Sequence, residues 1–508
     1  MRSKNSILNI IVNIGSQFVN ILLGFVCRTV FIRTLGEAYL GVSGLFSNIL
    51  TLLSLAELGV GTAIAFSMYK PLAENDHKKI GALMGLYKRT YRAIGLAVAV
   101  FGLAFTPFYP YFIKNPPDIP NLTIIYLLYV FNSVITYFLA YKQTIIAADQ
   151  KNYICTLYQY SASILQNAVQ IIILLKTGNF ILYLCTQIVF SFFSNLLLSR
   201  KADKMYPYLK TYEKEKLGRE DKHAITKNIK AMFMHRLGSV VVNGTDTLVM
   251  SSLVGIVSVG IYANYYLITN TLRNLTQQIF AGVTASVGNL GAVEDRKKSH
   301  RIYLSINFAG FWIFSFCAIC LICLFNPFMT LWLARKDLLF DMPVVFFIVL
   351  NFYATGMRQA TLTFKDSFGL FWYDRYKAVV EALVNLITSI LLTHQFGVIG
   401  IFMGTFISTM TVDFWVEPLV LFRHGFQMPV RTYFVRYSYY AVLTAAVGFL
   451  TWSACALVPG FGFFSFAAKL MICLILPNSL YLLIFWHSEE FEYLKGFLKP
   501  RKSGRKPQ

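Results

Sequence analysis

Long apolar stretches alternate with short polar ones along the whole chain. Windows of about 20 nearly uncharged residues recur from end to end, which is the length that an α-helix needs to cross the hydrocarbon core of a bilayer. The fold class that follows is an all-α membrane protein. The pattern predicts fourteen spanning helices, near residues 7–32, 39–68, 93–113, 121–147, 153–175, 179–199, 231–254, 258–290, 303–326, 342–364, 377–395, 397–421, 434–456 and 463–486.

Lysine and arginine are distributed unevenly between the two sides of this predicted topology. Of the 46 basic residues, 36 fall in alternate connections on one side, five on the other side and five inside predicted spans. Because basic residues concentrate in cytoplasmic loops, both termini are predicted to be cytoplasmic. The five on the opposite side are Arg33, Lys114, Lys176, Arg335 and Lys336.

A polar interruption divides the helices into two groups. Residues 201–230 carry many basic side chains, and a charge run of this length between apolar spans is typical of a cytoplasmic linker. The predicted organisation is an N-terminal six-helix bundle (1–200), this linker (201–230), a C-terminal six-helix bundle (231–422), two further helices (423–490) and a basic cytoplasmic tail (491–508).

The two groups of helices are similar to each other in sequence. A shift of 219 residues superposes Gly36 on Gly255, Leu40-Gly41-Val42 on Val259-Gly260-Ile261 and Asn132 on Asn351. A unit with an even number of helices that is used twice inserts both times in the same orientation, and such parallel repeats are found in alternating-access transporters. The repeat therefore favours a transporter over a channel.

Composition narrows the classes of function. The chain is 56% hydrophobic and 14% charged, and its net charge of +22 would suggest a nucleic-acid partner in a soluble protein. Here the basic residues lie in loops between apolar spans, so no nucleic-acid partner is predicted. The eight cysteines lie mostly in apolar runs, and the run Cys317-Ala-Ile-Cys-Leu-Ile-Cys323 has no nearby histidine or acid. Neither a disulfide framework nor a metal site is predicted.

Four segments form a pattern typical of one transporter family. They are Asn9-Ile-Ile-Val-Asn13, Phe31-Ile-Arg-Thr-Leu-Gly36 leading to Leu40-Gly41-Val42, Ala56-Glu-Leu-Gly-Val-Gly-Thr-Ala63, and Ile145-Ile-Ala-Ala-Asp-Gln150. With them the sequence resembles, over nearly its whole length, the Wzx-type flippases of O-antigen, capsule and exopolysaccharide units. That family is part of the multidrug/oligosaccharidyl-lipid/polysaccharide exporter superfamily, with the multidrug and toxin extruders (MATE) and the lipid II flippase. The second repeat lacks a clear counterpart of the Glu57 segment.

The resemblance implies a MATE-like pair of six-helix bundles around a hydrated cavity in the bacterial cytoplasmic membrane. It implies, as substrate, a polyprenyl-diphosphate-linked oligosaccharide repeat unit whose headgroup passes through that cavity during surface polysaccharide biosynthesis. The partners implied are membrane lipids, a polysaccharide polymerase and glycosyltransferases. The last two helices resemble a pair associated with a lipid-tail groove in the lipid II flippase, although an ordinary lipid-facing surface is the simpler interpretation.

Basic side chains inside the spans are candidates for binding the diphosphate. An anionic headgroup crosses the bilayer only along a path with cations and hydrogen-bond donors, and a guanidinium binds phosphate oxygens in bidentate fashion. The candidates are Arg28, Arg273, Arg358 and, near the cytoplasmic mouth, Lys142. Arg28 and Lys142 lie near the ends of spans, so an equally open interpretation is that they extend to the membrane interface.

Embedded acids and amides form two further sets of candidates. Glu57, Asp246, Glu381 and Asp413 are candidates for coupling to H⁺ or Na⁺, and equally for ion pairs with the arginines. Asn132, Gln143, Asn167, Asn351, Gln359 and Asn385 are candidates for hydrogen bonds to glycan hydroxyls. The alternative for these amides is hydrogen bonding between helices, which contributes about 0.6 kcal/mol for each bond in a membrane.

Covalent chemistry is not predicted. The seven histidines show no metal-ligand spacing with an acidic partner, and the chain contains no glycine-rich nucleotide-binding loop. Neither a bound cofactor nor an enzyme, such as a membrane glycosyltransferase or polymerase, is expected. Two other transport functions stay open: a lipid II flippase, and an ion-coupled multidrug extruder, whose organic-cation substrates would require an acidic and aromatic cavity.

Overall fold

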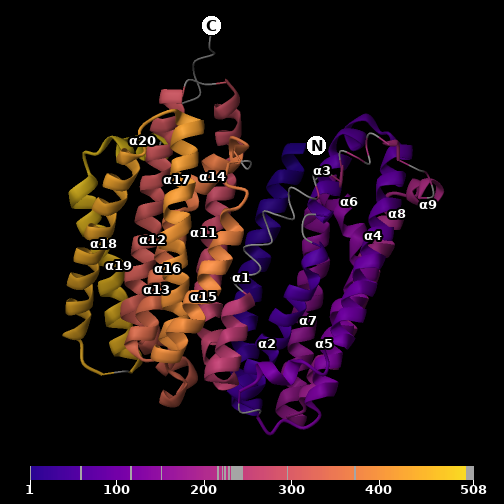
Figure 1. The fold of residues 1–508 in the computed structure, drawn as a ribbon, viewed down its shortest axis with the longest axis horizontal. Helices are drawn as coiled ribbons and strands as arrows, with labels where there is room; N and C mark the ends of the chain where they lie inside the picture. The colour runs from indigo at the N-terminus through magenta and orange to yellow at the C-terminus, as the bar shows by residue number, and fades with distance from the viewer. Residues whose placement is uncertain are drawn as a thin grey trace. The chain divides into compact units, whose positions relative to one another are not determined.

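The computed structural model describes residues 2–498 with gaps at 58–59, 115–116, 150, 294–295, 371–372 and 461, and between 214 and 243 it describes only 215, 217–219, 221, 223, 225, 226 and 229. In all of these residues the regular structure is helical, without a strand, and the predicted all-α fold is confirmed (Figure 1). Parts of three predictions lie outside them: the first half of the span at 231–254, part of the linker including Lys214, and residues 499–508 of the tail.

Membrane-spanning helices are recognisable by length and apolar composition. Among the described residues, seven helices meet both conditions, and the bent pair Val19–Leu35 and Glu37–Leu53 meets them when the two are taken together. The protein is therefore a multi-pass membrane protein. The count of fourteen spans stays a prediction.

The chain divides into two compact units, Met1–Ala263 and Asn264–Gln508. The boundary lies inside α11 (Ile256–Val293), further along the chain than the predicted linker. The first unit contains α1 (Arg2–Leu35), α2 (Glu37–Leu53), α3 (Val60–Glu74), α4 (His77–Ala104), α5 (Leu122–Leu139), α6 (Gln143–Ala148), α7 (Asn152–Thr177), α8 (Phe180–Met205), α9 (Tyr208–Tyr212), helical residues 244–249 and a π-helical turn at Met250–Val254.

Two predicted spans of the first unit are interrupted. The span predicted at 39–68 consists of α2 and α3, with a 3₁₀ turn at Ser54–Glu57 after α2. The span predicted at 121–147 consists of α5 and α6, with a 3₁₀ turn at Ala140–Lys142 between them. The chain also bends by 119° between α1 and α2, at Gly36, whose φ of 86° is a conformation that glycine adopts without strain.

The connection after α8 packs against α4 within the first unit. An added Cβ at Gly81 would overlap Tyr212, and one at Gly85 would overlap the carbonyl of Glu213, so this part of the chain lies directly on α4. Lys88 of α4 forms an ion pair with Glu213. The beginning of the connection is therefore held to α4 by both close packing and charge.

A close helix contact joins α2 to the beginning of α11, within the first unit. A Cβ on Gly41 would overlap the carbonyl oxygen of Ile256, and a Cβ on Gly260 would overlap that of Glu37. The two contacts are equivalent under the 219-residue shift, which carries Glu37 to Ile256 and Gly41 to Gly260. In both cases the residue before the helix is a glycine with positive φ. Backbone geometry therefore repeats where the sequence repeats.

The second unit is built around one long helix, α12 (Arg296–Leu333). The last two spanning helices, α18 (Arg431–Ala456) and α19 (Phe463–Phe485), pack against it (Figure 1). Phe311 of α12 stacks on Tyr440 of α18 with ring centroids 4.1 Å apart, and Trp312 Nε1 donates to Asn478 Oδ1 of α19 at 2.8 Å. The other helices are α13 (Met342–Met357), α14 (Gln359–Ser367), α15 (Lys377–Phe396), α16 (Val398–Ser408), α17 (Phe414–Val420) and α20 (Glu489–Leu498).

Candidate functional site

A polar pocket lies in the first unit among α2, α5 and α8. Its volume is about 230 Å³, and none of its lining residues is charged. Hydroxyl and amide groups, which both donate and accept hydrogen bonds, predominate in the lining, and such groups suit a ligand rich in hydroxyls. The lining residues, which define what we call the polar pocket, are Ser47, Leu50, Thr51, Ser54, Tyr129, Asn132, Ser133 and Gln187.

Asn132 presents hydrogen-bonding capacity at the polar pocket. Its Oδ1 is buried and has no hydrogen-bond partner among the described residues. One turn earlier on α5, the Tyr129 hydroxyl is hydrogen-bonded to the Ser43 hydroxyl of α2. A buried acceptor left without a partner costs about 1–3 kcal/mol, so a ligand hydroxyl that donates to Asn132 would bind favourably.

Arg28 interacts electrostatically with one of the residues that line the polar pocket, Tyr129. Arg28 is half-buried in α1, near the phenol groups of Tyr129 and Tyr183. Tyr129 lines the pocket together with Asn132, and it also interacts with the Arg28 guanidinium. Two of the predicted substrate-binding residues, Arg28 and Asn132, are thereby brought to one region of the first unit.

Glu57 lies close to the same region because α2 ends there. The 3₁₀ turn that follows α2 contains both Glu57 and the pocket residue Ser54. The Tyr91 hydroxyl donates to Glu57 Oε1 at 2.6 Å, and Tyr137 contacts both Glu57 and Ser54. The interruption of the predicted span therefore places a carboxylate with phenol partners next to the polar pocket.

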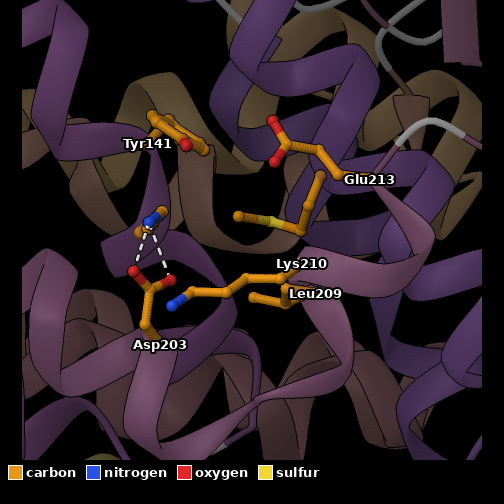
Figure 2. Close-up of a pocket in the computed structure, with 7 residues that line it drawn as sticks. Tyr141, Asp203, Leu209, Lys210 and Glu213 are labelled. Atoms are coloured by element: carbon orange, nitrogen blue, oxygen red, sulfur yellow. Dashed lines mark hydrogen bonds and ion pairs between the residues drawn. The ribbon is translucent and has the colours of Figure 1, made fainter.

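Lys142 lies in a different and smaller pocket. Its Nζ is 2.7 and 2.8 Å from the two carboxylate oxygens of Asp203, and Figure 2 shows Lys210 extending toward the same carboxylate. The cavity measures about 30 Å³, against about 230 Å³ for the polar pocket. Lys142 is thus engaged with Asp203, and this cavity is too small for a sugar. Its lining is completed by Met84, Tyr141, Leu209 and Glu213.

Two predicted amides of the first unit hydrogen-bond to other side chains. Gln143 donates from Nε2 to Asn195 Oδ1 at 2.6 Å and accepts from Gln159 Nε2 at 2.8 Å. This chain of amides joins α6 to α7 and α8. Asn167 reaches Ser163 on its own helix at 3.5 Å, the limit of a hydrogen bond. Gln143 therefore makes bonds between helices, and its contact with a glycan stays a prediction.

The second unit contains a buried cluster of charged side chains around Arg358, which is 8% exposed and lies between α13 and α14. Its guanidinium binds Glu417 in bidentate fashion, with Nε to Oε2 at 2.9 Å and Nη2 to Oε1 at 2.6 Å. Nη1 lies 2.6 Å from Asp413 Oδ2. Lys377 pairs with both acids, at 3.0 Å from Asp413 Oδ1, and Glu381 contacts Asp413.

This cluster engages the Arg358 guanidinium on three of its nitrogens. The acids Asp413 and Glu417 are both fully buried, so Arg358 is a counter-ion to them in this structure. Glu417 is absent from the candidates that the sequence suggested. Its spacing of four residues from Asp413 is the signal that could have found it, because residues four apart lie on one helix face.

Two asparagines of the second unit also make bonds between helices. Asn351 donates to the carbonyl of Phe402 at 2.9 Å, and Asn385 donates to Thr405 Oγ1 at 3.1 Å. In both amides the Oδ1 atom is buried without a hydrogen-bond partner among the described residues. The same holds for Asn132, which matches Asn351 in the internal repeat.

Three candidates remain, two in the second unit and one in the first. Arg273 is half-buried in α11, and Gln359 is half-buried at the start of α14. Asp246 is half-buried in the helical residues 244–249, beside Thr247, whose hydroxyl accepts from Asn48 Nδ2 at 3.1 Å. Their roles stay predictions.

The chain was compared with known proteins. Residues 6–287 match the family model described as polysaccharide biosynthesis protein, and no curated protein matches the sequence significantly. Solved structures share the fold at low identity. An inward-facing multidrug resistance MATE family transporter of the MOP superfamily has a TM-score of 0.65 and 13% identity, over 81% of this chain and 97% of that chain.

Two further structures show the same likeness. The lipid II flippase MurJ in an inward closed conformation has a TM-score of 0.67 and 14% identity, over 94% of this chain and 99% of that chain. The Vibrio cholerae MATE transporter VcmN in the bent form has a TM-score of 0.53 and 13% identity, over 84% of this chain and 98% of that chain. The MATE-like fold predicted from the sequence is therefore confirmed.

Proposed function

The chain belongs to the polysaccharide biosynthesis protein family, and from this premise we propose that it carries polyprenyl-diphosphate-linked oligosaccharide repeat units across the bacterial cytoplasmic membrane for surface polysaccharide biosynthesis. The family predicted from the sequence is thereby confirmed. In this proposal the protein is a flippase that works by alternating access, without covalent chemistry and without a bound cofactor. Both termini lie in the cytoplasm, and a polymerase and glycosyltransferases are its partners.

The observation that carries the proposal is the polar pocket with Arg28 beside it. A glycan headgroup brings hydroxyls, which require donors and acceptors, and a diphosphate, which requires a cation. The first unit offers hydroxyls and amides in the pocket and a half-buried guanidinium next to Tyr129. An organic cation would require carboxylates; none of the lining residues is one, and the carboxylate next to the pocket, Glu57, accepts a hydrogen bond from Tyr91.

The three arginines predicted to bind the diphosphate receive different assignments. Arg28 is assigned to the diphosphate, and Arg273 remains a second candidate. Arg358 is assigned a structural role, because its guanidinium is shared by two buried carboxylates. We further propose that Glu57 is the acid that couples transport to H⁺ or Na⁺, since it lies next to the polar pocket and carries a phenol partner, Tyr91.

Substitution of Arg28 tests the proposal in cells that depend on this protein. Arg28→Ala should lower surface polysaccharide about 10- to 100-fold and accumulate lipid-linked units on the cytoplasmic side, because a hydrogen bond to a charged group contributes about 1.5–3 kcal/mol. Arg28→Lys should restore part of the output, and Asn132→Ala should lower it by a smaller factor. The matched control is Arg33→Ala, which replaces an exposed arginine on the same helix.

Polysaccharide and protein abundance are measured together in these strains. Normal polysaccharide from a normally expressed Arg28→Ala protein would remove Arg28 from the substrate path. An equal loss of polysaccharide in the Arg28→Ala and Arg33→Ala strains would show that any substitution on this helix lowers the output, so that Arg28 has no specific role.

A further inference from the structure

Cysteines from three helices meet in the second unit. Cys323 lies on α12, Cys455 near the end of α18 and Cys473 on α19. Their three Sγ atoms all lie within 4.8 Å of one another, and those of Cys455 and Cys473 are 3.7 Å apart. The sequence places these residues 132 and 18 positions apart, so only the packing of α18 and α19 on α12 brings them together.

The separations are those of ligands around one metal ion. A thiolate binds Zn²⁺ at about 2.3 Å, and two such sulfurs at a tetrahedral angle lie about 3.8 Å apart. The pair Cys455 and Cys473 already has this spacing, and Cys323 Sγ lies within 4.8 Å of both. All three side chains are buried, at 7%, 4% and 0% exposed for Cys323, Cys455 and Cys473, so neither solvent nor lipid competes for the sulfurs.

The composition of the group selects a class of metal. A structural Zn²⁺ site takes four protein ligands, and the group found among the described residues has three, all of them sulfur. Cys320, one turn before Cys323 on α12, lies with its Sγ 4.0 Å from the Cys473 carbonyl oxygen and is not one of the three. Soft thiolate ligands favour Cu(I), Zn²⁺ and iron–sulfur clusters, and a group of three falls short of the four protein ligands of a structural Zn²⁺ site or a Cys₄ cluster, which leaves Cu(I). Two thiolates and one thiol around a monovalent ion also leave one net negative charge, which is less costly to bury than the charge left by three thiolates.

We propose that Cys323, Cys455 and Cys473 form a binding site for a soft monovalent metal ion of the Cu(I) class, which fastens α18 and α19 to α12. Cys455 is one residue from the end of α18. Binding releases two protons from the thiols and involves no change of oxidation state. The site is separate from the polar pocket, and the proposal does not depend on the transported substrate.

The experiment titrates the reduced, full-length protein in detergent with Cu(I) against a chelator that competes for singly bound copper. The wild-type protein should retain one Cu(I) for each chain. Cys455→Ser and Cys473→Ser should each weaken binding by more than about 100-fold, which exceeds the effect of residues that only orient a ligand. Cys155→Ser, which replaces a buried cysteine of the first unit, should bind as the wild type does.

Thermal unfolding separates loss of the site from loss of the fold. Without metal, the serine variants should unfold at the wild-type temperature, and Cu(I) should raise that temperature for the wild type and for Cys155→Ser alone. If Cys473→Ser does not fold, Cys323→Ser takes its place. Copper retained equally by the serine variants, no chelator-resistant copper in the wild type, or a protein mass two hydrogens lower because of a disulfide would each overturn the proposal.

Discussion

Arg358 shows how a single side chain can hold several helices of a membrane protein together. It lies between α13 and α14, and its partners come from the span that contains α16 and α17, while Lys377 begins α15. Each charge would be costly alone in hydrocarbon, so each requires the others. The cluster therefore stabilises one arrangement of these helices more than it stabilises helix formation itself.

Removing this arginine should destabilise the protein. Arg358→Ala leaves Asp413 and Glu417 buried with Lys377 as their remaining basic partner, and breaking a buried ion pair costs about 3–5 kcal/mol. We expect a lower unfolding temperature in detergent and lower abundance in the membrane. Arg375→Ala, at an exposed arginine nearby, should change neither. A stable Arg358→Ala protein that has lost transport would contradict the structural role and return Arg358 to the substrate path.

At the residue scale the sequence indicates which side chains are unusual but not which ones meet. Arg358 and Asp413 were both candidates from their depth in the spans, and their pairing depends on how separate helices pack. The three clustered thiols illustrate the same limit, because the run from Cys317 to Cys323 contains no sign of Cys455 or Cys473. The sequence marks Asn132 as a candidate for glycan contacts, and only the packing of α2, α5 and α8 shows that it lines a pocket.

At the scale of elements, hydropathy identifies apolar lengths and misses the interruptions within them. The span predicted at 39–68 breaks at Ser54–Glu57, and the one at 121–147 breaks at Ala140–Lys142. Both breaks carry candidate residues, Glu57 in the first and Lys142 in the second. A helix end exposes backbone groups and turns side chains in new directions, which explains why polar residues gather there.

The glycine contact between α2 and the beginning of α11 yields the prediction at this scale. Gly41→Val and Gly260→Val place side chains against carbonyl oxygens of the facing backbone, which cannot move aside as a side chain can. Each should lower the free energy of unfolding by at least about 1–3 kcal/mol, which is the usual cost of overpacking. Gly24→Val, at a helical glycine with open space around its Cβ position, is the control. Denaturation of the three purified variants checks this, and equal stability of all three would contradict a close contact.

For the whole molecule, the sequence predicts the class of fold and the repeat. The 219-residue shift matches Gly36 with Gly255 and Gly41 with Gly260, and the structure places these glycines at equivalent helix starts and contacts. The boundary between compact units lies inside α11, where no change in composition marks it, and the division at the linker 201–230 stays a prediction. Charge patterns locate loops, whereas the packing of a continuous helix depends on contacts far away in the sequence.

The predicted topology can be tested on the intact membrane. Cysteine introduced at Lys176 should react with an impermeant maleimide added outside spheroplasts, since Lys176 is exposed and on the predicted outer side. Cysteine at Lys78, also exposed, should react only after the membrane is permeabilised. The unmodified chain measures the background from the native thiols. The reverse order of labelling would place the termini outside the cell.

Translocation in proteoliposomes tests the central claim most directly. Vesicles that contain the purified protein and a fluorescent polyprenyl-diphosphate oligosaccharide are treated with an impermeant quencher, which reports movement between leaflets. The account predicts rapid movement with the wild-type protein and with Arg33→Ala, and little with Arg28→Ala. Failure of the wild type to move this lipid, in vesicles where the same protein exports an organic cation or moves lipid II, would contradict it.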